Sequence, residues 1–181
     1  MVTSNNQGEG DIQLPRLRQV FILDCPKLKL VPHYIMFSHT LKQLTIRNCP
    51  ELGGVQPRLP PLLENLELWR DVGVFSKSLP LVGECSSYPN LKSVSIFSSP
   101  HSSLPKGFNR LTSIQRLELF KCETLDFELE ELKHLTMLQK LWIGDCPILK
   151  ERCGEGKDWR STLSHVPKIY IDDKEITASR N

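Results

Sequence analysis

A leucine pattern that recurs along most of the chain is the feature that most restricts its fold. The pattern reads L-x-x-L-x-L-x-x-C/N-x-x-L, and it is degenerate or shortened in the third, fourth and seventh copies. The seven copies begin at Leu17, Leu41, Leu63, Leu91, Ile114, Leu138 and Val166. Consecutive copies start 22 to 28 residues apart. Because chance alternation of apolar residues rarely gives so many phased copies, the sequence predicts a repeat protein.

Each L-x-L segment predicts a short β-strand, because alternate side chains of a strand point to the same side. One such strand buries too little surface alone, whereas parallel copies join their inward faces into one core. The repeat length falls in the range of about 20 to 29 residues that is typical of leucine-rich repeats. We therefore predict an α/β repeat solenoid, a leucine-rich-repeat horseshoe segment with a parallel concave β-sheet and a mostly irregular or 3-10 convex side.

The amino-acid composition disfavours the main alternative, a helical bundle. The chain of 181 residues contains 28 Leu and 13 Pro but a single Ala, although Ala is the best helix former. Residues 127–138 carry a leucine at every third position and predict a short helical turn on the convex side. We expect residues 1–12 to be a disordered N-terminal segment, residues 13–171 to form a domain of about six to seven repeats, and residues 172–181 to be a C-terminal tail.

Four of the six cysteines share one position of the repeat, directly after the strand: Cys25, Cys49, Cys122 and Cys146. We predict that they are buried, reduced thiols inside a turn, where a small polar group meets backbone groups. A metal site or a set of disulfides is the alternative for this column. Cys85 and Cys153 lie outside the column, and their role stays open.

Several classes of function are disfavoured by the sequence. The net charge is +2 and there is no long basic run, so we expect no nucleic-acid partner. Because there is neither an apolar stretch of membrane-spanning length nor a secretory signal, we expect a cytoplasmic protein with no membrane contact, and the nucleus as the second compartment. We predict no enzyme and no catalytic, cofactor-binding or metal-binding residue, since metal-ligand spacing is absent around the histidines, which are His33, His39, His101, His134 and His165.

Three consecutive segments resemble a known family. They are SLPKGFNRLTSIQRLELFKCETL at 103–125, ELEELKHLTMLQKLWIGDCPILKERC at 128–153, and GEGKDWRSTLSHVPKIYIDDKEI at 154–176. They look like the C-terminal leucine-rich-repeat region of plant intracellular nucleotide-binding leucine-rich-repeat immune receptors. The resemblance implies a module for ligand sensing and autoinhibition. Its partners would be a pathogen effector, a host protein or the receptor's own nucleotide-binding domain.

Two points limit what the resemblance implies. The phosphate-binding loop G-x-x-x-x-G-K-[ST] of the family is absent, so we expect no ATP binding by this chain. A generic leucine-rich-repeat scaffold, which bridges signalling proteins or serves as a ubiquitin-ligase adaptor, is the alternative function.

We also expect the first repeat to lack a cap. Leu14, Leu17 and Val20 would then be partly uncovered and would favour self-association.

The strand pattern also predicts which side chains face outward on the concave side. Residues between and after the two inward positions of each strand should form columns across the sheet, with neighbours about 4.8 Å apart. We expect Trp69, Phe97 and Phe120 to form a contiguous aromatic ridge, with Trp142 diagonally next to Phe120. Exposed aromatic and arginine side chains often dominate protein interfaces. The candidate protein-binding residues are Phe21, Arg47, Trp69, Arg70, Phe97, Arg116, Phe120, Lys140, Trp142 and Tyr170.

Overall fold

The computed structural model describes residues 16–53, 59–79, 88–153, 159–172 and 174–176. These residues form one sheet of eight strands in chain order. The strands from β1 to β7 are parallel, and β8 is antiparallel to β7. The strands are β1 Gln19–Leu23, β2 Gln43–Arg47, β3 Asn65–Trp69, β4 Ser93–Phe97, β5 Arg116–Phe120, β6 Lys140–Gly144, β7 Lys168–Ile171 and β8 Lys174–Glu175.

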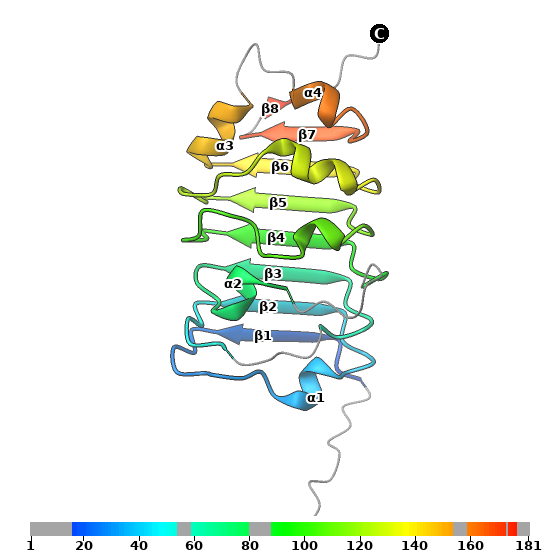
Figure 1. Ribbon diagram of the computed structural model, residues 1–181. Helices are drawn as coiled ribbons and strands as arrows, with labels where there is room; N and C mark the ends of the chain where they lie inside the picture. The colour runs from blue at the N-terminus through cyan, green and yellow to red at the C-terminus, as the bar shows by residue number, and fades with distance from the viewer. Residues whose placement is uncertain (1–15, 54–58, 80–87, 154–158, 173, 177–181) are drawn as a thin grey trace, which may run out of the picture.

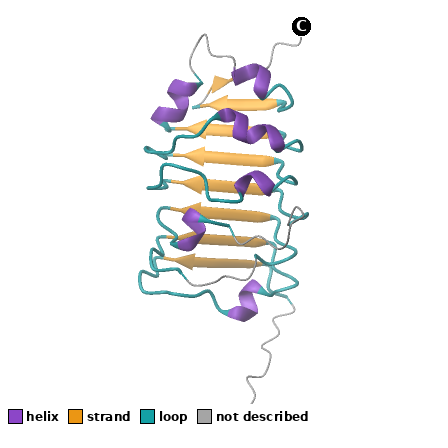
Figure 2. Cartoon of the chain, viewed as in Figure 1, coloured by secondary structure: helices purple, strands orange, loops and turns teal. Residues whose placement is uncertain are grey.

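The short helices lie together on one face of this sheet, as Figures 1 and 2 show. They are α1 His33–Met36, α2 Val74–Lys77, η1 Phe108–Arg110, η2 Leu129–His134, α3 Pro147–Arg152 and α4 Trp159–Thr162. We call the face that points away from them the open face. Each helix in the described ranges falls short of the length and apolar character that crossing a bilayer requires.

The predicted strands are confirmed at each of the seven repeats, because every L-x-L segment lies in one of the strands from β1 to β7. The strand register pairs equivalent positions of successive repeats, for example Leu44 with Leu66 and Ile46 with Leu68. Both inward positions are buried in the strands from β2 to β7. The core is therefore a stack of aliphatic layers between the sheet and the helix side, and the described chain has the repeat-like α/β arrangement that the spacing predicts.

The connections on the helix side combine 3-10 turns with short α-helices of four to six residues. The helical turn expected within residues 127–138 is present as η2, a 3-10 helix. Its leucines recur every third residue, which matches three residues per turn. Leu129, Leu132 and Leu135 are all buried, so the same period that defines the helix also fixes it to the core.

The cysteine column lies inside the turn that follows each strand. The Cys49 thiol is 3.2 Å from the carbonyl of Arg47, and the Cys146 thiol is 3.3 Å from that of Gly144. The four cysteines of the column are free thiols; Cys49, Cys122 and Cys146 are buried as predicted, whereas Cys25 in the first repeat is half-buried. The described residues contain no group of three metal-ligating side chains. Burial raises the pKa of the Cys49 thiol, which keeps it protonated as a donor. Cys153 is also buried, and Cys85 lies outside the described residues.

The residue between the strand and the cysteine position adopts a left-handed conformation in each of the first six repeats, with φ between 51° and 60°. These residues are Asp24, Asn48, Arg70, Ser98, Lys121 and Asp145. The turn keeps the backbone ladder intact, because the N–H of Asn48 donates to the carbonyl of Trp69 at 3.0 Å and that of Lys121 to Gly144 at 2.9 Å. Left-handed backbone is tolerated best by Asn, Asp and Gly. Three of these six positions, Arg70, Ser98 and Lys121, therefore carry residue types that do not favour their own conformation.

The two ends of the domain differ in how they finish. Residues 1–12 and Leu14 lie outside the described residues, and Leu17 and Val20 are half-buried as expected. At the other end, β8 lies within residues 172–181, the expected tail, and pairs Lys174 with Ile171. Asp172 follows Ile171 at the position that Gly144 holds in the preceding repeat, and it adopts a left-handed conformation. The strand β7 is consequently one residue shorter than each strand from β1 to β6.

Candidate protein-contact face

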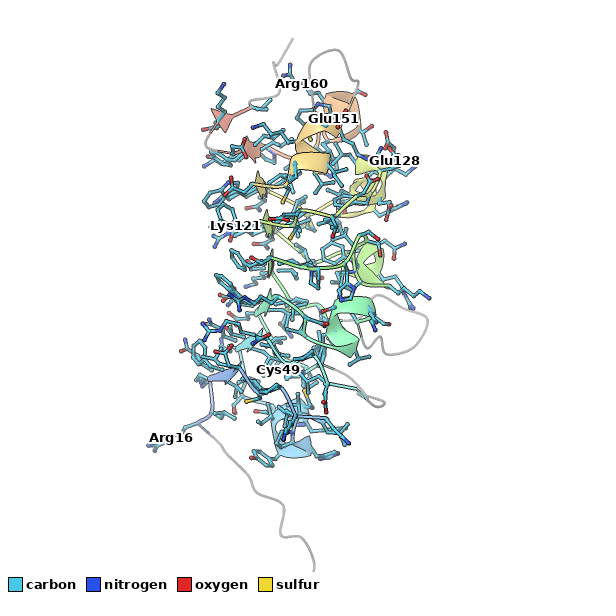
Figure 3. All side chains as sticks on the ribbon, turned by 90° about the vertical axis from the view of Figure 1, so that its left-hand side faces the viewer. Arg16, Cys49, Lys121, Glu128, Glu151 and Arg160 are labelled. Carbon is cyan, nitrogen blue, oxygen red and sulfur yellow. The ribbon has the colours of Figure 1, made fainter. Side chains whose placement is uncertain are left out.

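Alternation along each strand places its first, third and fifth residues on the open face. The register joins the third positions into one column and the fifth positions into another. The fifth column contains Leu23, Arg47, Trp69, Phe97, Phe120 and Gly144. Figure 3 shows the molecule turned so that the side chains of the sheet project on one side and the helices lie on the other. The open face thus has the columns that the sequence spacing predicts.

Four aromatic side chains form a continuous row across the strands from β3 to β6. The rings of Trp69 and Phe97 are stacked, with centroids 3.9 Å apart and an interplanar angle of 14°. Phe97 and Phe120 meet edge to face at 6.3 Å, and Phe120 meets Trp142 in the same way at 6.3 Å. All four side chains are half-buried. We call Trp69, Phe97, Phe120 and Trp142 the aromatic row.

A glycine allows the row to cross from the fifth column to the third. A Cβ at Gly144 would come within 2.5 Å of the Phe120 ring, so the ring occupies space that any other residue would fill. The indole N–H of Trp142 donates to the carbonyl of Asp172 at 3.0 Å. Trp142 is therefore fixed from one side by Phe120 and from the other by the turn after β7.

Cations extend the row at its C-terminal end. The Lys140 ammonium lies 4.9 Å from the ring centroid of Trp142 and 5.4 Å from that of Tyr170, and 3.5 Å from the Glu118 carboxylate. Such cation–π contacts stabilise an ammonium over an aromatic face. The Tyr170 hydroxyl donates to Glu175 at 3.3 Å. Partial burial and this carboxylate raise the pKa of Tyr170, so its hydroxyl remains a neutral hydrogen-bond donor.

Three of the expected contact residues lie apart from this cluster. Phe21 is 55% exposed on the first strand and pairs in register with Thr45 rather than with an aromatic residue. Arg47 forms an ion pair with Asp24 of the preceding repeat, which holds the Asp24 carboxyl pKa below its usual value. Arg70 is one of the left-handed residues after the strand. It follows the C-terminal end of β3, an interior strand, and is exposed.

The structure places two of the expected contact residues, Arg116 and Lys140, in a groove whose outline the sequence pattern does not give. A groove with a volume of about 480 Å³ runs along the N-terminal ends of the strands from β3 to β7. Its lining residues are Asn65, Lys92, Ser93, Gln115, Arg116, Gln139, Lys140, Pro167 and Lys168. We call it the basic groove, because four of these nine residues are cationic and none is acidic. Its signal in the sequence is a basic or amide residue at the first strand position or just before it.

Comparison with known proteins finds similarity to a plant disease resistance protein. Disease resistance RPP13-like protein 1 of Arabidopsis thaliana is 32% identical over 114 residues, or 61% of this chain. The match links the chain to plant disease resistance proteins. The aligned part is about 10% of that protein's length. No protein-family model matches the chain.

The open face offers aromatic, apolar and charged groups side by side. The aromatic row offers ring edges and apolar area, and its N-terminal part is lined by Glu67. This carboxylate accepts from Thr45 at 3.4 Å and from the Trp69 indole at 3.5 Å. Ser95 donates in the same way to Glu118 at 3.3 Å. These bonds anchor side chains that face outward, so the surface presents a preset arrangement of aromatic and charged groups.

Proposed function

We propose that this chain is a leucine-rich-repeat recognition module of a plant immune receptor and that it binds protein partners through the open face. In this proposal the open face is the concave side of the solenoid. The module has no enzymatic activity of its own and binds no cofactor, and it acts in the cytoplasm. Its partner is a pathogen effector, a host protein or the nucleotide-binding domain of the receptor.

The aromatic row is the observation that carries the proposal. Four large rings lie in contact across four strands on a face that the described helices leave uncovered (Figure 1). Soluble proteins rarely expose contiguous apolar patches without a contact role, and Trp and Tyr are enriched among the residues that dominate interface energetics. The similarity to a plant disease resistance protein supports the immune setting.

The repeat register supports the leucine-rich-repeat assignment. One strand recurs every 22 to 28 residues, equivalent positions pair in parallel, and the thiol column lies in the following turn. In such an array the inward residues hold the fold while the outward residues are free to vary. Binding specificity then belongs to the open-face columns.

The test compares proteins retained from plant cell extract by the wild type and by a Trp69→Ala/Phe120→Ala variant. We expect the variant to retain about tenfold less of each specific partner, or even less. The reason is that truncating an aromatic anchor at an interface costs more than about 1–2 kcal/mol of binding free energy. A matched control is Tyr34→Ala/Met137→Ala, which removes two exposed apolar side chains from the helix side. Circular dichroism verifies folding of both variants. Equal retention by all three folded proteins would refute the proposal.

A further inference from the structure

We propose that the basic groove binds an acidic, extended segment of a protein partner. This inference rests on the proposed function and goes further by naming the chemistry of the partner. It starts from the first-position column of the open face, where Arg116, Lys140 and Lys168 are direct neighbours in the strand register. Lys92, one residue before β4, adds a fourth cation to the same groove.

The charges of the groove are only partly compensated by the protein itself. Lys140 is 3.5 Å from Glu118, but no ion pair joins Lys92, Arg116 or Lys168 to any other described residue. Arg116 and Lys168 are exposed. The remaining lining residues are uncharged, and three of them are amides, Asn65, Gln115 and Gln139. Lys42 and, more weakly, Lys92 lower the pKa of the Glu64 carboxyl, so Lys92 is partly compensated. An acidic ligand would therefore meet two cations without a carboxylate partner, Arg116 and Lys168, together with several amide donors and no carboxylate in the lining.

The spacing of these cations fits a polypeptide. Adjacent strands lie about 4.8 Å apart, so the three first-position cations span about 10 Å across β5, β6 and β7. An extended chain advances about 3.3 Å per residue and points alternate side chains to the same side, so two carboxylates at positions i and i+2, about 6.6 Å apart, face the column within this distance. The rings of Trp142 and Tyr170 lie two residues further along the same strands. Apolar side chains of the segment could contact them while its carboxylates face the column.

A nucleic acid fits the same surface less well. Single-stranded nucleic acids bind through bases that stack on free ring faces. Here Trp69 and Phe97 stack on each other at 3.9 Å, and Lys140 lies over both Trp142 and Tyr170. The Phe120 ring packs against Gly144. Each of these rings already has a close neighbour within the protein, so fewer ring faces are free for bases, and carboxylate recognition is the better match to the charges.

Nuclear magnetic resonance titration of the full chain tests the inference, with hexaglutamate as the probe. We expect it to shift the amide signals of Arg116, Lys140 and Lys168, and hexaglutamine to leave them unchanged. Arg116→Glu/Lys168→Glu should weaken apparent affinity about tenfold or more, because two exposed attractions become repulsions. The milder Arg116→Gln/Lys168→Gln variant should show a smaller loss. The amide spectrum of each variant reports directly on its folding.

The matched control is Lys77→Glu/Lys133→Glu, which makes the same charge change at two exposed positions on the helix side. It should change affinity less than about twofold, since distant exposed charges are screened. The inference is overturned if hexaglutamate shifts no groove signal, if the control weakens binding as much as the groove variant, or if hexauridylate binds as tightly. If only the inference about the basic groove is wrong, hexaglutamate does not bind the groove, but partner retention still depends on the aromatic row. If only the proposed function is wrong, hexaglutamate binds the groove, but partner retention does not depend on the aromatic row.

Discussion

At the scale of single residues, the turn after several strands places residues in a left-handed backbone conformation that their residue types do not favour. Lys121 has a φ of 54°, and left-handed backbone costs a non-glycine residue about 1 kcal/mol or more, with Asn among the best tolerated. We expect Lys121→Asn to raise the free energy of unfolding by about 0.5–1 kcal/mol in urea denaturation. Lys121→Gln is the control, because it removes the same charge without favouring the left-handed region. Equal stabilisation by both substitutions would contradict this explanation.

The same residues show which parts of the turn can be predicted from the sequence and which cannot. Asp24, Asn48 and Asp145 have side chains suited to left-handed backbone, so a careful reader could place a turn there. Arg70, Ser98 and Lys121 give no such signal, and only their position in the repeat imposes the conformation. The step of the aromatic row from Phe120 to Trp142 was predictable from the register, but the role of Gly144 was not, because it depends on where the Phe120 ring points rather than on residue spacing.

At the scale of elements, ion pairs hold α3 against the neighbouring repeats. Arg152 bonds Asp126 and Glu128, and Lys150 pairs with Asp172. These partners lower the carboxyl pKa of Asp126 and of Asp172. A carboxyl with a lowered folded-state pKa stabilises the fold above its unfolded pKa of about 3.9 and loses that contribution as the pH falls.

We therefore expect the stability of the C-terminal repeats to be constant near neutral pH and to fall as the pH drops below about 4. Arg152→Gln should reduce this dependence, because Asp126 then loses the partner that lowers its pKa. Thermal unfolding followed across the acid range measures it. If Arg152→Gln and the wild type lose the same stability over that range, the ion pairs of Arg152 do not contribute to the pH dependence.

The strands were predictable because the L-x-L spacing and the inward aliphatic pairs are direct physical signals. The helix-side turn within residues 127–138 was predictable for the same reason, since a period of three residues is the period of a 3-10 helix. β8 was not, because Lys174 and Glu175 are exposed and polar and only pairing with β7 makes them a strand. In the basic groove, Arg116 and Lys140 were predictable from the strand register, whereas Lys92 was not because it lies outside the strand pattern.

At the scale of the whole molecule, β1 at the N-terminal end of the sheet combines an unpaired strand edge, among the described residues, with exposed apolar side chains. Among the described strands β1 pairs only with β2, and Phe21 and Leu23 are 55% and 40% exposed. An open strand edge beside apolar side chains favours association. We expect the chain to self-associate with rising concentration in analytical ultracentrifugation.

A Phe21→Glu/Leu23→Glu variant should shift this equilibrium toward the monomer, because it places charges beside the open edge. Met137→Glu, at an exposed apolar position on the helix side, should leave it unchanged. A wild type that remains a single monomeric species at high concentration would show that this end does not drive association.

The central claim is that protein partners contact the open face, and site-specific photo-crosslinking tests it most directly. A photo-reactive phenylalanine analogue replaces Phe97 in the aromatic row in one version of the chain and Tyr34 of α1 on the helix side in another. In plant cells, we predict that the specific partners crosslink at position 97 and not at position 34. Crosslinking of those partners at position 34, with none at position 97, would contradict the account.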